Sequence, residues 1–448
     1  MRMKTFKKQT CRYRFKFKGN EKITARGGVV LIDALAREYS LPKKIAQMAA
    51  LDPRKRKGAG FAPEALATQI IYGLCCGATS LKDIERIGRD RVWLGLVGLR
   101  QGADESTLGE WLRAQTAESL AALQQLNKDF VRWAMSKTKP GRLLSGGVLD
   151  VFFDDTEIEV HGCKIEGARW NYDNRLALSF QTLWTGPFVL DSQLGSPGDV
   201  SDMLVEMIQE NGEAWAAHKS HFYADSASSA AEHLKSIEDD GQFTTWSVSY
   251  NKWTSKLDRM ASELPAPAWT DAQAPAEYPT QFAYLKHRPG KADRDYVFAV
   301  RKQQRPDELL PRFGYVVGRS GGTDPELFMQ KHQLKGACEL GFKGLLSTLD
   351  LHHPPCLKLE ANQAFYALAV LAHNLLQALK LIELDDSQQA MSLHSIVYSL
   401  ICVPAALSTH ANYRTATFCL AGDLLAWFRK HVMARFPRRR PGRPRDGT

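Results

Sequence analysis

Three acidic residues of this sequence stand where carboxylates can do chemistry. Asp154 lies within a strand-like stretch, FFDDTEIEV (residues 152–160), and shares one face of it with mostly apolar side chains. Asp225 closes a second strand-like stretch, HFYAD, directly before a helical one. Glu339 falls in a predicted helix that begins near residue 325. An ionised carboxylate among apolar neighbours is costly unless a cation pairs with it, and a metal ion would serve.

Each of these acidic residues also has a plain structural explanation. Asp154 fits an ordinary hydrogen-bonded strand residue, and Asp225 fits a helix N-cap. Glu339 is four residues from both Lys335 and Lys343, a spacing that is typical of solvated ion pairs on a helix surface. The local patterns therefore leave structural and catalytic roles open.

The composition predicts a multidomain chain with a polyanionic partner. The 448 residues are 44% hydrophobic and 24% charged, which fits two or three globular domains. The net charge of +10 has its excess at the chain ends, so nucleic acid is the first candidate partner. The longest apolar stretch, residues 365–376, is too short to span a bilayer and predicts a core helix, so we expect no membrane partner.

Cysteine and histidine patterns indicate neither a disulfide framework nor a zinc site. The eight cysteines have no CxxC pair and no regular spacing, which favours a reducing cytoplasm. No secretory signal pattern opens the chain. His352 and His353 precede two prolines and fit a loop better than a ligand pair.

Changes of pattern along the chain divide it into predicted regions. The first is mostly helical with a basic strand near its start (CRYRFKFK), and its short helices beside a basic loop at residues 54–57 are compatible with a helix-turn-helix that binds DNA. A mixed α/β region follows, is interrupted by a β-rich insertion, and resumes before C-terminal helices and a basic tail. The boundaries are 1–140, 145–250, 251–322, 323–385, 386–434 and 435–448.

The C-terminal tail, RFPRRRPGRPRDGT, is basic and proline-rich. Its Pro-Gly-Arg-Pro core, with Arg440 and Arg443, resembles an AT-hook, a segment that lies in narrow A·T-rich minor grooves. A basic tail with only non-specific affinity explains the same composition. Both interpretations predict contact with DNA.

The acidic residues, in their order and contexts, resemble the DDE transposases of bacterial insertion sequences. In that family the first Asp lies on the first strand in a D-x-T context, and the second ends a later strand in an A-D-S context. The Glu follows a β-rich insertion on a helix with an aromatic, basic, Glu, Lys pattern. The matching segments here are residues 154–156, residues 224–226, and His332, Lys335, Glu339 and Lys343. His332 and Lys335 stand where the family usually has Tyr and Arg, and the similarity spans roughly residues 20–430.

The resemblance implies a fold and a site. The fold class is α/β: a ribonuclease-H-like mixed sheet with flanking helices, a β-rich insertion and an N-terminal all-α DNA-binding module. Asp154, Asp225 and Glu339 would hold two Mg²⁺ or Mn²⁺ ions, and Asp155 is an alternative to Asp154 as first ligand. Hard oxygen ligands select such ions.

The resemblance also implies an activity. The enzyme would cleave DNA at insertion-sequence ends and join the 3′-hydroxyl ends to target DNA, with the metal ions activating the attacking oxygen and stabilising the leaving one. His332, Lys335 and Lys343 would contact DNA. A homodimer acting on terminal inverted repeats and target DNA, in the bacterial cytoplasm at the nucleoid, is expected.

Two other functions stay open at this point. One is a catalytically inactive, transposase-derived DNA-binding regulator, and the other is a ribonuclease-H-like nuclease that cuts DNA without joining it. All three acidic positions are occupied by carboxylates, which favours the enzyme.

Overall fold

The computed structural model describes most of the 448-residue chain. The described ranges are 22–54, 60–162, 164–171, 173–198, 200–251, 254–410 and 413–435. Glu339 is described by its backbone alone. The predicted basic strand near residue 11, the basic residues 55–57 and the tail beyond residue 435, with Arg440 and Arg443, lie outside the described residues.

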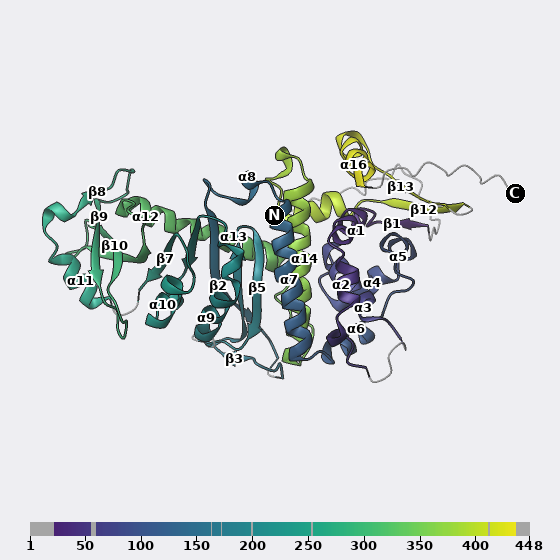
Figure 1. Ribbon diagram of the computed structural model, residues 1–448, viewed down its shortest axis with the longest axis horizontal. Helices are drawn as coiled ribbons and strands as arrows, with labels where there is room; N and C mark the ends of the chain where they lie inside the picture. Colours follow the sequence, from purple (N-terminus) through teal and green to yellow (C-terminus); the bar gives the residue numbers. More distant parts are fainter. Residues whose placement is uncertain are drawn as a thin grey trace, which may run out of the picture.

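A helical module forms one end of the molecule and reaches the sheet with its last helices (Figure 1). Its helices are α1 (Val29–Glu38), α2 (Leu41–Ala46), η1 (Ala49–Leu51), α3 (Pro63–Cys75), α4 (Leu81–Gly88), α5 (Arg91–Val97), α6 (Glu105–Arg113), α7 (Ala117–Lys137) and α8 (Pro140–Leu143). The Ser80 side chain caps α4 by accepting a hydrogen bond from the Asp83 amide. Asp104 caps α6 through the Thr107 amide. The predicted all-α character of this region is therefore present.

A ten-stranded mixed sheet forms the middle and the other end of the molecule. Its strands are β2 (Leu149–Glu159), β3 (Arg169–Trp170), β4 (Leu176–Thr185), β5 (Phe188–Gly195), β6 (Ser220–Ala224), β7 (Thr245–Tyr250), β8 (Thr270–Asp271), β9 (Thr280–His287), β10 (Tyr296–Gln303) and β11 (Arg312–Arg319). Within it, β5, β4 and β2 are antiparallel, while β2, β6 and β7 are parallel and adjacent. This is the order of a ribonuclease-H-like sheet, and the predicted fold class is confirmed.

The β-rich insertion continues the same sheet. Strands β9, β10 and β11 are antiparallel neighbours, as the alternating sequence predicted, and β11 pairs with β7. One helix of this region, α11 (Ser255–Ser262), precedes the strands. The insertion therefore extends the mixed sheet at the β7 edge and does not form a separate one.

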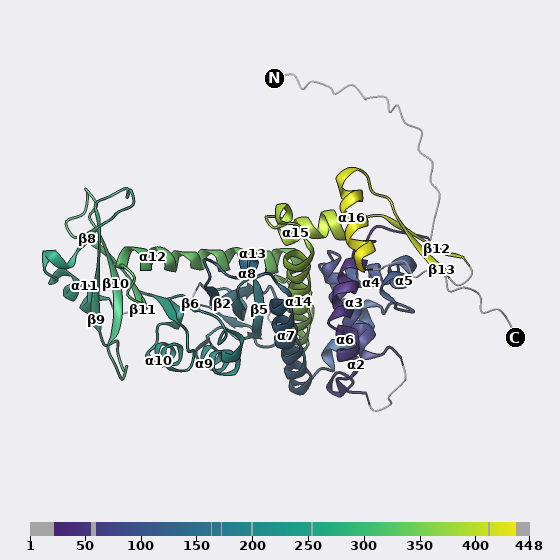
Figure 2. The same ribbon diagram turned by 45° about the horizontal axis from the view of Figure 1, so that its top comes forward.

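Helices cover both faces of the sheet (Figure 2). On one side lie α9 (Val200–Asn211) and α10 (Ala231–Asp239); on the other lie α12 (Pro325–His332), the 3₁₀ turn η5 (Gln333–Lys335) and α13 (Gly336–Leu349). As predicted, α12 begins after an N-cap, Asp324, whose carboxylate accepts hydrogen bonds from the Glu326 and Leu327 amides.

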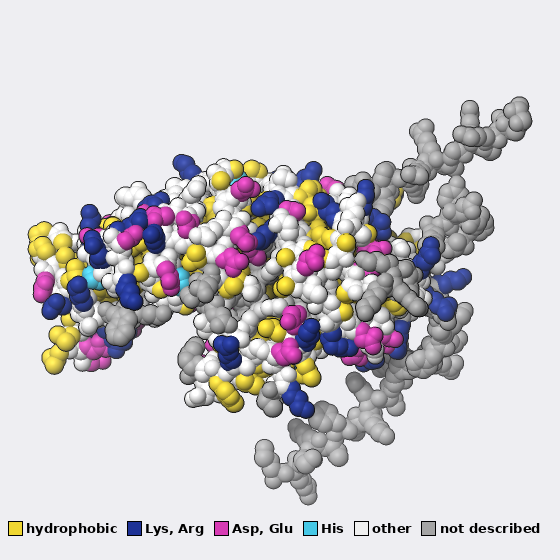
Figure 3. Space-filling view, turned by 60° about the horizontal axis from the view of Figure 1, so that its bottom comes forward, with side chains coloured by type: hydrophobic (Ala, Val, Ile, Leu, Met, Phe, Trp, Pro, Cys, Tyr) yellow, Lys and Arg dark blue, Asp and Glu magenta, His cyan; other side chains and the backbone are white. Residues whose placement is uncertain are grey.

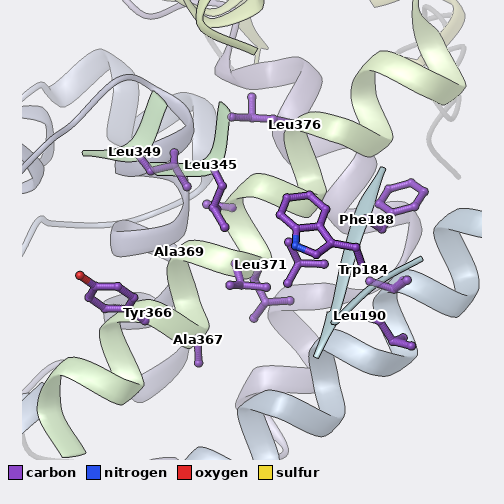
Figure 4. Packing of buried hydrophobic residues seen from close by; sticks show 14 of the residues in the cluster. Trp184, Phe188, Leu190, Leu345, Leu349, Tyr366, Ala367, Ala369, Leu371 and Leu376 are labelled. Atoms are coloured by element: carbon purple, nitrogen blue, oxygen red, sulfur yellow. The ribbon is translucent and has the colours of Figure 1, made fainter. Parts of the chain in front are cut away.

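Helix α14 (Leu359–Ala378) is the centre of the hydrophobic core. It packs against α3, α7 and β5, so it joins the helical module to the sheet. Figure 4 shows Leu371 of α14 near Trp184 of β4 and Leu345 of α13. Within the described residues, the stretch 359–383 has the length and hydropathy of a membrane span, but 83% of its apolar window is buried inside the protein. The prediction of a core helix accounts for this burial.

The C-terminal region differs from the prediction of helices alone. After α15 (Leu393–Ile396) and the π-helical turn η8 (Val397–Ile401), the chain forms a hairpin of β12 (Ala405–His410) and β13 (Tyr413–Phe418), and then α16 (Gly422–Arg435). Strand β12 also pairs with β1 (Ile23–Thr24), which brings the two ends of the described chain together. The alternating, threonine-rich sequence ALSTHANYRTATF favours strands, which explains the correction.

Candidate active site

Asp154 and Asp225 lie on the same face of two adjacent parallel strands. The rings of Phe152 on β2 and Tyr223 on β6 are register partners and stack, with their centroids 4.8 Å apart. Each aspartate is two residues beyond one of these rings, and positions two apart share a face. Neighbouring strands are about 4.8 Å apart, so the two carboxylates are neighbours. The predicted pair is therefore brought together.

Asp154 is a largely buried carboxyl group. Its side chain is 13% exposed, and burial raises its pKa to about 6. The ammonium of Lys335, whose Nζ is 3.7 Å from Oδ1, lowers the pKa, while the carboxylate of Asp225 raises it. The two carboxylates together carry more negative charge than the single ammonium of Lys335 neutralises. This excess of negative charge favours the binding of a further cation.

Asp155 points to the opposite face of β2. Its carboxylate accepts a hydrogen bond of 2.5 Å from the Ser179 hydroxyl of β4, and burial raises its pKa. Strand alternation thus separates Asp155 from the face that α13 covers, and the geometry favours Asp154 as the first ligand.

Asp225 follows β6 directly and caps the short turn η3 (Ser226–Ser228). Its Oδ1 accepts a hydrogen bond of 2.9 Å from the Ala227 amide. The N-cap that the sequence suggested is therefore real. Because one oxygen makes the cap, the carboxylate is held in place with its second oxygen as a possible metal ligand.

The backbone of Glu339 crosses the sheet next to Asp154. Before it in the chain, Lys335 contacts Asp154 on β2. After it, a Cβ at Gly341 would lie 3.3 Å from the ring of Trp184 on β4, and the Phe342 ring is 5.5 Å from the same ring. Helix α13 therefore runs over β2 and β4 at this point, and a Cβ at Gly341 would press against the Trp184 ring.

His332 lies in the interior at the end of α12. Its Nε2 is 2.7 Å from the Ser249 hydroxyl and its Nδ1 is 2.9 Å from the Ser247 hydroxyl, both on β7. Ser247 also bonds the buried His221 of β6. Burial lowers the pKa of His332 to about 4, so the ring is neutral at neutral pH. This place offers DNA no exposed surface of the ring, and His332 instead ties α12 to β7.

The family of the chain follows from comparison with known proteins. Residues 6–435 match the family described as "Transposase DDE domain group 1". The chain belongs to this family of DDE transposases. The family generally uses divalent metal ions and comprises enzymes that cut and join DNA. Comparison with curated proteins gave no significant match.

One solved structure similar to this transposase is titled "Cryo-EM structure of piggyBac transposase synaptic complex with hairpin DNA (SNHP)". The match has 11% sequence identity and a TM-score of 0.45, and covers 94% of this chain and 87% of that chain.

The other residues considered in the sequence of the transposase differ in their exposure to solvent. Lys343 is exposed on α13, where a phosphate has access to it. Lys335 is only 14% exposed and is paired with Asp154. His352 and His353 are exposed in the turn after α13, as expected of a loop.

Sequence reasoning missed the hydroxyl–imidazole network of this transposase. It consists of Thr245, Ser247 and Ser249 on alternate positions of β7, with His221 and His332 between them. A buried strand with a hydroxyl at every second position needs polar partners on that face, because buried polar groups must be hydrogen-bonded. The alternating hydroxyl residues of β7 were therefore the sequence feature that could have predicted this network.

The donor chemistry of the site fits a hard divalent ion. Among the described residues, no group of three or more His, Cys, Asp or Glu side chains is arranged for a metal, and the Glu339 side chain is outside that description. The transposase nevertheless places two carboxylates on one face, beneath the helix that carries the third. An all-oxygen set of this kind selects Mg²⁺ or Mn²⁺ over softer metals.

Proposed function

We propose that this transposase cleaves DNA at the ends of an insertion sequence and joins the 3′-hydroxyl ends to target DNA by metal-ion phosphoryl transfer. One observation carries the proposal: Asp154 and Asp225 share a face of adjacent parallel strands, and the helix of Glu339 passes over that face. On this proposal, oxygen ligands from three separate segments would meet at one point of the sheet.

The three acidic residues would hold two Mg²⁺ or Mn²⁺ ions. When bound, such ions activate the attacking oxygen and stabilise the departing one. Burial makes the ionised form of Asp154 costly, which is why its pKa is raised. A bound cation would remove this cost, so Asp154 is suited to hold a metal ion. Asp225 is oriented by its bond to the Ala227 amide. Lys343 and, once it leaves Asp154, Lys335 would bind DNA phosphates.

The charge distribution supports DNA as the partner. Residues 1–21 and 436–448 together hold 13 Lys or Arg and two acidic residues, so the net charge of +10 comes from the two ends. Figure 3 shows basic and acidic side chains interspersed over one face of the folded body. Basic ends bind phosphates without sequence preference and would hold the protein on DNA. We propose a homodimer on terminal inverted repeats and target DNA, acting in the bacterial cytoplasm.

A plasmid assay tests this function. Purified full-length protein is incubated with Mg²⁺, a supercoiled plasmid carrying the sequences that flank its gene, and a target plasmid. We expect nicking at the element ends followed by strand joining. Asp225→Asn should lower both by at least about a hundredfold, because loss of a metal ligand removes several kcal/mol of transition-state stabilisation.

The matched control is Asp173→Asn, which changes an exposed aspartate in the loop between β3 and β4. It should leave nicking and joining unchanged. DNA binding without nicking would instead show a DNA-binding regulator, and nicking without joining would show a nuclease. Full activity of Asp225→Asn would refute the site.

A further inference from the structure

Lys335 is placed as a cation inside the candidate site. Its Nζ is 3.7 Å from Asp154 Oδ1, and the two side chains are only 14% and 13% exposed. It ends the turn η5, and the residue before this turn, His332, is hydrogen-bonded to Ser247 and Ser249 of β7. The ammonium is therefore held over Asp154 by a fixed turn, unlike a surface ion pair that forms and breaks freely.

The ammonium and a divalent ion require the same carboxylate. A metal ion at Asp154 would stand within a few ångströms of Nζ, and like charges at that distance repel strongly in a partly buried site. The carboxylate has a second oxygen, but the repulsion between the two cations opposes holding both at once. We therefore expect metal binding to move Lys335 away from Asp154.

The side chain of Lys335 can move although its turn is fixed. Its Nζ is 3.7 Å from Asp154 Oδ1, which is beyond hydrogen-bond distance. The flexible four-carbon stem therefore lets the ammonium leave Asp154 by rotation about its own bonds. A DNA phosphate at this place would offer the ammonium a second anionic partner.

We propose that Lys335 is the resident cation of the metal-free site, and that DNA and metal replace it together. A DNA phosphate draws the ammonium away from Asp154, and the divalent ion takes its place. The inference rests on the proposed function and describes how that site is regulated. Metal would bind weakly to the free protein and tightly to the protein on DNA, so the competent site would form where the substrate is.

This exchange makes a thermodynamic prediction. If the binding of a DNA phosphate and the binding of a metal ion both require Lys335 to leave Asp154, each ligand raises the affinity of the protein for the other by the same factor. Couplings between two sites in proteins are typically about 5- to 150-fold. Removing the ammonium should tighten metal binding in the absence of DNA and should reduce the coupling.

The test measures Mn²⁺ binding by electron paramagnetic resonance on full-length protein, with and without a 40-base-pair duplex. We expect Lys335→Met to bind Mn²⁺ roughly 5- to 30-fold more tightly than the wild type without DNA, and DNA to tighten its binding less. Lys335→Gln, which stays neutral but can still hydrogen-bond Asp154, should behave likewise. The control Lys137→Met removes a charge from an exposed position at the end of α7 and should match the wild type with and without DNA.

The Mn²⁺ binding that is lost in Asp154→Asn is the binding at the proposed site. This variant also distinguishes a failure of the proposed metal site from a failure of the lysine exchange. If Asp154→Asn leaves Mn²⁺ binding of the wild type unchanged, the metal site of the proposed function is refuted. If Mn²⁺ binding depends on Asp154 but has the same or lower affinity in both Lys335 variants, the exchange alone is refuted.

Discussion

Asp154→Asn should stabilise the protein at neutral pH when no metal is present. Burial raises the pKa of Asp154 from 3.8 to about 6, so the folded protein holds the ionised form at a cost. One pKa unit corresponds to about 1.4 kcal/mol, and the two-unit rise corresponds to about 3 kcal/mol at pH 7.5. The pKa of about 6 already includes the attraction of Lys335, so the ion pair that asparagine loses is already counted. The expected gain in the free energy of unfolding is therefore about 3 kcal/mol at pH 7.5.

The pH dependence of this gain has a definite sign. The folded state binds the Asp154 proton more tightly than the unfolded state does, so ionisation destabilises the wild type at pH values above about 6. As the pH falls from 6 to about 4, the carboxyl group becomes protonated in the folded protein and the cost disappears. The advantage of Asp154→Asn should therefore be full at pH 7.5 and nearly absent at pH 4.

Urea unfolding in EDTA, at pH 7.5 and at the lowest pH where the wild type folds, measures the gain. Asp173→Asn serves as the exposed control and should have no effect at either pH. Added Mg²⁺ should stabilise the wild type and not Asp154→Asn, because a ligand that binds only the folded state adds stability. A loss of stability in Asp154→Asn at pH 7.5 without metal would refute the view that this carboxylate is held for a cation.

Two further predictions concern the scaffold and the tail. Gly318→Ala should lower the free energy of unfolding in urea by more than about 2 kcal/mol, because its Cβ would lie 2.0 Å from the Trp246 carbonyl oxygen. Gly344→Ala should be neutral or stabilising, since a Cβ there meets nothing within 4 Å. Equal effects of the two substitutions would contradict the packing. Deleting residues 436–448, which include five arginines, should weaken binding to duplex DNA and lower the slope of log affinity against log salt by up to about 4, as measured by fluorescence anisotropy. An unchanged slope would show that the tail does not contact phosphates.

Local rules predicted much of the site from the sequence. Alternation along β2 separates Asp154 from Asp155, and the structure confirms that they face opposite sides, with Asp155 bonded to Ser179. The cap at Asp324 and the strands of the insertion were also predictable, since each depends on residues close in the chain. These features follow from backbone geometry over a few residues.

Non-local pairing accounts for what the sequence did not reveal. His332 was expected at the DNA, yet its ring is buried between Ser247 and Ser249, more than 80 residues earlier in the chain. Its position in the family pattern suggested a contact with DNA, but the partner of a side chain across a sheet cannot be read from local pattern. The pairing of β12 with β1, at opposite ends of the chain, was missed for the same reason.

The insertion sets the position of the helix that carries Glu339. Helix α12 packs on β9 and β10, and Phe328 of α12 forms a small apolar cluster with Ala299 and Val316 of the insertion strands. The same helix is tied to β7 by His332 and leads through η5 to Lys335 over Asp154. Because β11 pairs directly with β7, the strands beneath α12 and the strands next to Asp154 and Asp225 belong to one continuous sheet. In the proposed site, the long interval between the second and third acidic residues would therefore be the platform that positions the helix of Glu339.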